Sequence, residues 1–288
     1  MSTVELPENL RLLTIVAHPH DATYTLGTSA HHIERGDSVT VVSVTDGVTT
    51  HDEELEDEMR KAESERDPAI LNRSRSDQAQ RKQEELGRVC GLFGIEDVRV
   101  LPFADNPIDP SPEVVKTLVG IFYEVRPHIV ITHAPYNYPH HRHYPILDHD
   151  HPAAGILAAR AMQRISQPDA NRMHAPHKVA QIYYIGVEFG WTDIDLFVDI
   201  SDQMANRIRA EGLYETQGHT PEFARKRIEA FAGYHGWFGN SGYAEPFIRA
   251  RGQFSTHLSV TDRELEQSLE TGKQNLERIG YFASGQEE

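Results

Sequence analysis

The chain has 288 residues, of which 39% are hydrophobic and 25% are charged, an ordinary balance for a globular protein. Its formal net charge of −16 argues against binding to nucleic-acid phosphates, and no run approaches the roughly 20 apolar residues of a membrane-spanning helix. The first residues lack the basic and apolar regions of a signal peptide and Cys90 is the single cysteine, so we expect a cytoplasmic protein without nucleic-acid or membrane partners.

The expected elements alternate between strands and helices along the chain. Apolar runs rich in branched side chains indicate strands at 12–17, 38–47, 98–101, 128–135, 179–187 and 195–200. Helical patterns separate most of them, at 23–35, 75–94, 113–125 and 152–165, and a further one covers 201–217. This alternation predicts an α/β, Rossmann-like fold with a mainly parallel sheet and helices on both faces.

We expect a single domain over residues 1–288. Its α/β core is predicted at 10–200, and a C-terminal helix and irregular extension at 201–288. Two segments rich in histidine and aspartate follow strands of the core: HPHD at 18–21 follows the first, and DHDH at 148–151 ends the loop after the fourth. In open parallel sheets, ligands bind outside the carboxyl ends of the strands, where the strand order reverses. The active site is therefore expected at the C-terminal ends of strands one and four.

The residue types at these strand ends are suited to metal binding. His18 and Asp21 lie three residues apart on a turn, so one imidazole and one carboxylate can converge on a single ion. A catalytic zinc site takes three such ligands and leaves a fourth position for water. The alternative is that these side chains cap helices or form hydrogen bonds within loops, and spacing alone does not separate the two.

Several segments between residues 11 and 247 resemble, in order, the LmbE-like/PIG-L family of zinc-dependent N-deacetylases. The first four are LLTIVAHPHDATYTLG, which resembles the family's AHPDDE motif and the helix after it, VVSVTDG, EELGRVCGLFGI and RPHIVITHAP. DHDHPAAG stands where the family has H-x-D-H, and FVDISDQMANRIRAEGLYETQ and GYAEPF resemble its later segments.

The resemblance implies a metal-dependent amide hydrolase. It would remove the acetyl group of an N-acetylated amino sugar, or of a related acyl-amine, through a metal-activated water. His18, Asp21 and His151 are implied as the metal ligands, with one Zn²⁺ per chain and Fe²⁺ as the alternative ion. A small-molecule substrate and a homo-oligomer are also implied.

The chain departs from the family pattern at two positions. His20 stands where the family has an aspartate that acts as general base, and Asp148 stands where it has the first histidine of H-x-D-H. Because a histidine with a pKa near 6.5 is a competent base at neutral pH, we expect the two roles to be exchanged. His20 then takes the proton of the attacking water, and His20 or His149 returns it to the leaving amine. Asp148 and Asp150 would orient histidines by accepting their second N–H.

Substrate contacts are expected from Arg81 or Lys82, Asp105 and Tyr138. Arg81 or Lys82 falls where the family has a substrate-gripping arginine, Asp105 follows the third strand, and Tyr138 lies in the histidine-rich loop. The alternatives are helix-surface charges, a turn-forming aspartate and a tyrosine that only packs.

Two other functions are compatible with this sequence. If the change at position 20 reflects decay, the chain is a non-catalytic metal- or sugar-binding relative. Two histidines and one aspartate also describe the triad of non-haem iron oxygenases, whose sites usually lie in β-barrels. Metal identity and oxygen dependence separate the oxygenase from the hydrolase.

Overall fold

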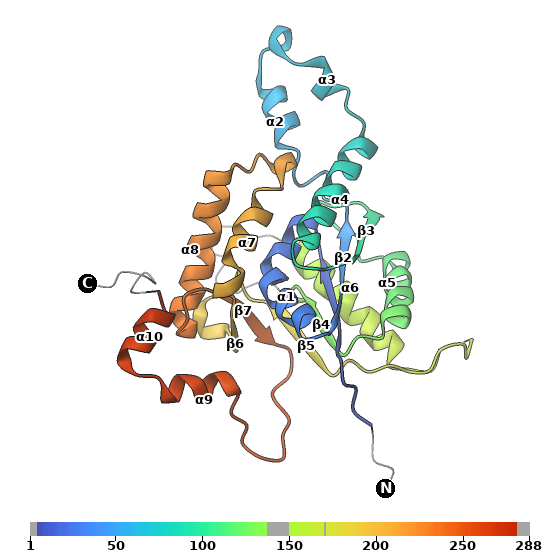
Figure 1. The fold of residues 1–288 in the computed structure, drawn as a ribbon. Helices are drawn as coiled ribbons and strands as arrows, with labels where there is room; N and C mark the ends of the chain where they lie inside the picture. The colour runs from blue at the N-terminus through green and yellow to red at the C-terminus, as the bar shows by residue number, and fades with distance from the viewer. Residues whose placement is uncertain (1–4, 137–149, 170, 281–288) are drawn as a thin grey trace.

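The computed structural model describes residues 5–136, 150–169 and 171–280 (Figure 1). At its centre is a seven-stranded sheet in the order β3-β2-β1-β4-β5-β7-β6. The strands are β1 (Arg11–Val16), β2 (Ser38–Thr45), β3 (Asp97–Phe103), β4 (Ile129–Thr132), β5 (Gln181–Ile185), β6 (Leu196–Asp199) and β7 (Ala244–Arg249). Strands β1 to β5 pair in parallel, and β7 runs antiparallel to both β5 and β6. The mainly parallel α/β sheet expected from the sequence is confirmed.

Helices cover both faces of this sheet because alternate side chains of its strands point to opposite sides. The helices are α1 (Leu26–Glu34), α2 (Glu53–Arg60), α3 (Pro68–Leu71), α4 (Arg75–Gly91), α5 (Pro112–Val125), α6 (Asp150–Ile165), α7 (Met204–Glu211), α8 (Pro221–Gly239), α9 (Asp262–Leu269) and α10 (Gly272–Arg278). On β1, Leu13 and Ile15 pack in a buried cluster with α5 and α6. Leu12 and Val16 pack on the other face with α1, α4 and α7. Among the described residues, no helix is long and apolar enough to cross a membrane.

The chain beyond residue 200 is more regular than the sequence predicts. The α/β core was expected to end at residue 200. Strand β7, which follows that residue, lies between β5 and β6 and belongs to the sheet. Helix α8 packs against β6, β7 and α7 (Figure 1). Its glycines weaken the local helical signal, yet a Cβ at Gly239 would lie 2.6 Å from Phe197 Cβ, so close packing requires glycine there. The sequence of β7, AEPFIR, contains Pro246 and a glutamate, so its strand conformation comes from its two neighbours rather than from local propensity.

The strand order reverses between β1 and β4. Strand β1 pairs with β2 on one side and with β4 on the other, both in parallel. The carboxyl ends of β1 and β4 therefore lie side by side, with His18 close behind the first and His133 directly behind the second. This is the position that the sequence predicts for the active site.

Candidate metal centre

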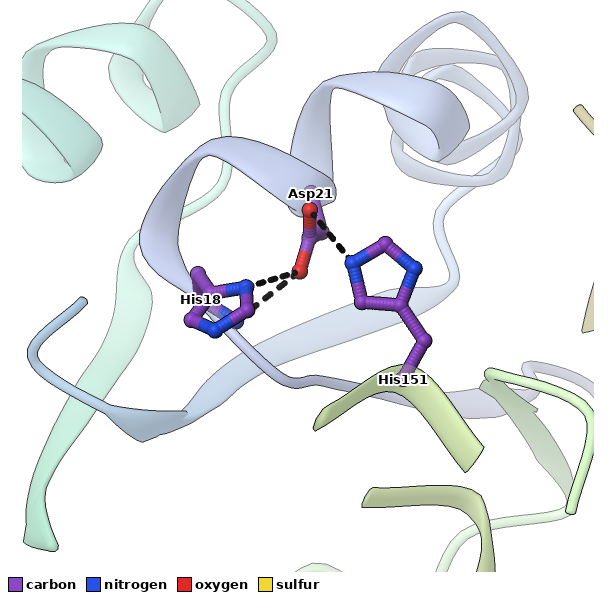
Figure 2. A group of neighbouring side chains, drawn as sticks. All are labelled: His18, Asp21 and His151. Atoms are coloured by element: carbon purple, nitrogen blue, oxygen red, sulfur yellow. Dashed lines mark hydrogen bonds and ion pairs between the residues drawn. The ribbon is translucent and has the colours of Figure 1, made fainter. Parts of the chain in front are cut away.

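Three side chains implied as metal ligands, those of His18, Asp21 and His151, meet beyond the end of β1 (Figure 2). One ligand atom from each lies within 4.8 Å of the others. His18 Nδ1 is 3.2 Å from Asp21 Oδ2, and His151 Nε2 is 3.4 Å from Asp21 Oδ1. The fold thus joins the turn after β1 with the first residues of α6 around one carboxylate.

The turn after β1 holds His18 and Asp21 on the same side. Pro19 opens a short 3₁₀ helix, Pro19–Thr25, and its fixed φ suits this first position. Asp21 Oδ2 accepts the backbone N–H of His18 at 2.9 Å. The carboxylate that faces the two imidazoles therefore also fixes the backbone from which one of them extends.

Each histidine of the cluster is held by another carboxylate through its second ring nitrogen. His18 Nε2 is 2.8 Å from Asp150 Oδ2, and His151 Nδ1 is 2.6 Å from Glu188 Oε1. Each outer carboxylate holds a proton on the nitrogen that it faces, so the nitrogen that faces Asp21 is the one that would give up its proton to a bound metal. Asp150 was predicted to orient a histidine, and the structure places it against His18. Glu188 was not predicted, although its position soon after β5 matches that of the other site residues behind strands.

Charge coupling makes this cluster suitable for a cation. Burial opposes a positive charge on His18, but hydrogen bonds to Asp150 and Asp21 outweigh it and raise the pKa of His18 to about 9. Burial also opposes a charge on His151, whereas Asp21 and Glu188 raise its pKa to about 10. Burial disfavours the Asp21 carboxylate, yet the surrounding histidines hold its pKa well below the usual range. Both rings therefore hold a proton that balances the neighbouring carboxylates, and a bound cation would take the place of that positive charge.

A fourth imidazole, from His133, lies against the cluster. Its Nε2 is 3.4 Å from Asp21 Oδ2, and its ring stacks on that of His151 with centroids 4.1 Å apart. Burial and the charge on His151 lower the pKa of His133, so the ring is neutral. Within the described part of the chain, its buried Nε2 has no hydrogen-bond partner, which fits a site built for an ion or a polar substrate. The two-imidazole, one-carboxylate donor set itself fits zinc.

His20 belongs to a second polar cluster, centred on the fully buried Glu211. His20 Nε2, His219 Nδ1 and Arg227 Nε lie 3.0, 3.4 and 3.0 Å from Glu211 Oε1. Burial disfavours the carboxylate, but His20 and the two arginines Arg227 and Arg207 lower the pKa of Glu211 to about 2. The sequence did not single out Glu211, which lies within the segment FVDISDQMANRIRAEGLYETQ that carries part of the family resemblance.

Side chains from both clusters line one cavity of about 430 Å³, a size typical of small-molecule sites. Its walls are formed by His18, His20, Asp21, Tyr24, Thr50, His51, Glu53, Asn106, Asp150, His151, Gln217, His219 and Arg227. The cavity therefore places the candidate metal ligands and His20 around a common space.

Asp105 holds the backbone of the loop that contributes Thr50 to the cavity. It is buried and accepts the backbone N–H groups of Thr49 and Thr50 at 3.1 and 2.6 Å. The Thr50 hydroxyl lies 3.3 Å from His18 Nε2. Asp105 is absent from the residues that line the described cavity, so its contacts are those of a residue that positions a loop.

Arg81 and Lys82 lie on α4 and are not among the residues that line the described cavity, although Lys82 interacts electrostatically with Glu53 and His51 of that lining. Arg81 Nη1 is 3.2 Å from Glu54 Oε2, and the Lys82 side chain is buried, which lowers its pKa. Tyr138, Asp148 and His149 lie outside the described residues, so their expected roles stay predictions.

Helix α6 places His151 at the candidate metal centre only because the helix packs closely against the end of β4. A Cβ at Gly155 would lie 2.4 Å from the backbone oxygen of His133. We expect Gly155→Ala to destabilise the protein by about 1–3 kcal/mol, the usual range for overpacking. It should also weaken zinc binding, because Asp150 and His151 begin the same helix. Thermal unfolding and calorimetric zinc titration measure the two effects.

Gly120→Ala is the matched control for this substitution. Gly120 lies on α5, where an added Cβ meets nothing within 4 Å. Because alanine has the higher helix propensity, we expect a stability gain of up to about 1 kcal/mol and an unchanged zinc affinity. Equal effects of the two substitutions would contradict the role assigned to close packing at Gly155.

Comparisons with known proteins support a family assignment. A sequence model of the PIG-L family, described as GlcNAc-PI de-N-acetylase, matches residues 13–161. The diacetylchitobiose deacetylase of Thermococcus kodakarensis is 27% identical over 250 residues, which cover 82% of this chain and 81% of that protein.

Two solved structures share the fold. The 4-carboxy-2-hydroxymuconate hydratase of Pseudomonas putida KT2440 aligns with a TM-score of 0.67 and 18% identity, over 87% of this chain and 100% of that one. The N,N'-diacetylchitobiose deacetylase of Pyrococcus horikoshii aligns with a TM-score of 0.63 and 22% identity, over 83% of this chain and 82% of that one. Since the family model spans more than half of its residues, this chain belongs to the PIG-L (GlcNAc-PI de-N-acetylase) family.

Proposed function

We propose that this protein is a metal-dependent hydrolase that removes the acetyl group from an N-acetylated amino sugar. The observation that carries the proposal is the convergence of His18, Asp21 and His151 in one cavity, with a carboxylate behind each histidine. Membership of a family described as a de-N-acetylase supplies the reaction. The deacetylase of diacetylchitobiose among the relatives favours a sugar as the substrate.

His18, Asp21 and His151 would hold the ion, which we propose to be Zn²⁺, with Fe²⁺ as the alternative. Such an ion lowers the pKa of water to about 7 and polarises a carbonyl oxygen. His133 Nε2, 3.4 Å from Asp21 Oδ2, would stand against the carboxylate that binds the ion rather than in the described lining of the cavity. The carboxylates of Asp150 and Glu188 hold both ligand rings in one orientation.

His20 is the proposed general base. Glu211 faces its Nε2, so the proton of the neutral ring resides there and Nδ1 is left as the acceptor. The ionised Glu211 carboxylate also stabilises the imidazolium that forms when Nδ1 takes a proton. In this proposal, water adds to the amide carbonyl while His20 removes its proton, and the same proton passes to the nitrogen of the leaving amine as the C–N bond breaks. The products are acetate and the free amino sugar.

The sequence predicts that His20 and Asp148 exchange the roles of base and partner. In this proposal, His20 is the base and its partner carboxylate is Glu211 instead of Asp148. Glu211, from α7, is the described carboxylate that faces His20. Asp148 and His149 stay predicted participants, because both lie outside the described residues.

The other functions are distinguished by their chemistry. The α/β fold also occurs in a hydratase, so the fold alone does not decide the reaction. The family match favours amide hydrolysis over the iron oxygenase that shares a two-histidine, one-carboxylate donor set. A non-catalytic relative would bind metal and sugar without turnover.

Acetate release tests the proposal. We expect the zinc-loaded protein to release acetate from N,N'-diacetylchitobiose or N-acetylglucosamine, measured by a coupled enzymatic assay. EDTA should abolish the release, and added zinc should restore it. Full metal occupancy without acetate from either sugar would contradict the proposal, and oxygen consumption by an iron-loaded protein would favour the oxygenase.

A further inference from the structure

Helix α8 has two apolar faces, of which the described residues cover one. Ile228 and Ala232 are buried on the inner face, in a cluster with residues that lead into α7. The other face exposes a set of aromatic side chains, which we call the aromatic stripe: Phe223, Phe231, Tyr234, Trp237 and Phe238. At 3.6 residues per turn, these five positions fall within an arc of about 120° on the helix. A helix that is apolar on all sides is normally buried on all sides, so we expect the stripe to be covered.

The second half of α8 has the composition of an interface. Residues 230–240, AFAGYHGWFGN, contain no Asp, Glu, Lys or Arg, in a chain of which 25% is charged. Trp191, which is itself half exposed, stacks on Phe238 with ring centroids 4.9 Å apart and extends the stripe beyond the helix. Enrichment in Trp, Tyr and Phe together with depletion of charge is typical of the centre of a protein–protein interface.

The segment after β7 exposes a second apolar set. Residues 250–261, which we call the C-terminal arm, run away from the sheet before the chain reaches α9 (Figure 1). Phe254 and Leu258 of this arm are both 98% exposed. Helix α9 then lies beside the end of α8, where Gln267 Nε2 is 3.5 Å from the backbone oxygen of Asn240. The arm and the aromatic stripe are therefore close to each other on the molecule.

The charge of the arm suits an acidic partner. The arm contains Arg251 and no Asp or Glu, and Arg249 lies just before it, whereas the whole chain has a formal net charge of −16. A basic arm is therefore attracted to the acidic surface of another copy of the chain. On that surface, the exposed Asp193 lies two residues after Trp191 of the stripe.

A pair of copies buries enough surface to be stable. Because each chain carries one arm and one stripe, a two-fold symmetric pair makes the same contact twice. A fully buried aromatic side chain covers about 150–250 Å², so the two contacts would bury roughly 2,000 Å² in total. Stable protein–protein interfaces bury about 1,200–2,000 Å². One reciprocal contact thus covers both exposed apolar sets.

We propose that two copies of this chain associate by a reciprocal contact in which the C-terminal arm of each copy lies on the aromatic stripe of the other. Phe254 and Leu258 pack against Trp237 and its neighbours on the stripe, and Arg251 approaches the partner's Asp193. None of the residues of the arm or the stripe lines the described cavity at the candidate metal centre. The proposal is therefore independent of the reaction that the site performs.

Sedimentation analysis of the full chain tests the association. We expect a dimer, or a larger assembly that contains it, in the wild type. The double substitution Phe254→Ser and Leu258→Ser should raise the Kd at least about 30-fold, as should Trp237→Ser, because each removes a central side chain of the contact. These side chains are exposed, so the variants should fold as the wild type does, which circular dichroism checks.

Met173→Ser is the matched control for these variants. Met173 is a large apolar side chain that is 76% exposed, and it lies outside both the arm and the stripe. Its Kd should equal that of the wild type. A wild-type monomer at every soluble concentration, or equal Kd values for all the variants, would overturn the proposal and leave the stripe to a different partner.

Disulfide cross-linking identifies the surfaces that meet. Cys90 is the single cysteine and is buried, so an introduced exposed cysteine provides the reactive thiol. Trp237→Cys and Leu258→Cys are prepared as separate proteins, mixed and oxidised. A cross-linked pair that forms in the mixture, but in neither variant alone, supports the reciprocal contact whatever the size of the assembly. A pair formed by one variant alone would place like surfaces against each other, and this result, like the absence of any pair, would overturn the proposal.

Discussion

Asp21→Asn is expected to abolish zinc binding and to lower acetate release by about 10³-fold or more. The Asp21 carboxylate lies within 3.4 Å of ring nitrogens from His18, His151 and His133, and it also accepts the backbone N–H of His18. Asparagine removes the negative charge that balances these imidazoles and presents N–H donors to an ion. Metal catalysis contributes several kcal/mol of transition-state stabilisation, and each 1.36 kcal/mol changes the rate about tenfold. Calorimetric zinc titration and the acetate assay measure the two losses.

Asp202→Asn is the matched control for this substitution. Asp202 belongs to a similar group with His31 and Glu34, but its side chain is 61% exposed and lies outside the lining of the described cavity. We expect its zinc affinity and acetate release to equal those of wild type. Tight zinc binding by Asp21→Asn, or an equal loss in both variants, would remove Asp21 from the metal site.

His20→Ala is expected to lower kcat by about 10²–10⁴-fold, the usual contribution of a general base, while zinc stays bound. His20 lines the cavity but is absent from the group formed by His18, Asp21 and His151, so its loss should separate catalysis from metal affinity. Elemental analysis alongside steady-state kinetics reports both quantities. Removal of the ring also takes away one of the three side chains that face Glu211 Oε1, with His219 and Arg227 remaining, so thermal unfolding should be followed in parallel.

His31→Ala removes an imidazole of the same kind outside the cavity and serves as the control. His31 also pairs with a carboxylate, that of Asp202 at 2.9 Å, although this pair is exposed whereas His20 and Glu211 are buried. We expect no change in its kcat. A His20→Ala variant that is fully zinc-loaded and retains wild-type kcat would show that His20 is not the base and would favour another group of the cavity.

The sequence predicts most of the sheet because local patterns determine it. The apolar run in β1 and the branched residues of β2 are buried almost throughout, which is the pattern of strands covered on both faces. Strand β7 has no such run, and it forms because β5 and β6 each offer it an edge. The signal for β7 therefore lies in residues distant along the chain.

The candidate site shows the same contrast. Residues that lie close together along the chain could be predicted, whereas partners that are distant along the chain could not. His18 and Asp21 could be predicted because both lie on one turn, and His151 because it ends DHDH, which stands where the family has H-x-D-H. Glu188 and Glu211 could not, since their partners His151 and His20 lie 37 and 191 residues away along the chain. A lone glutamate on a predicted helix is usually solvated. Only the packing of α7 against the turn after β1 buries Glu211 and makes it a partner of His20.

Anomalous scattering from a zinc-loaded crystal, recorded at the zinc absorption edge, tests the central claim most directly. We predict one strong peak between His18 Nδ1, the Asp21 carboxylate and His151 Nε2. The described residues contain a competing cluster, formed by His20, Glu211 and His219, of which His20 and His219 line the same cavity. A principal peak at that cluster, or no peak at either site in fully zinc-loaded protein, would contradict the proposed metal centre.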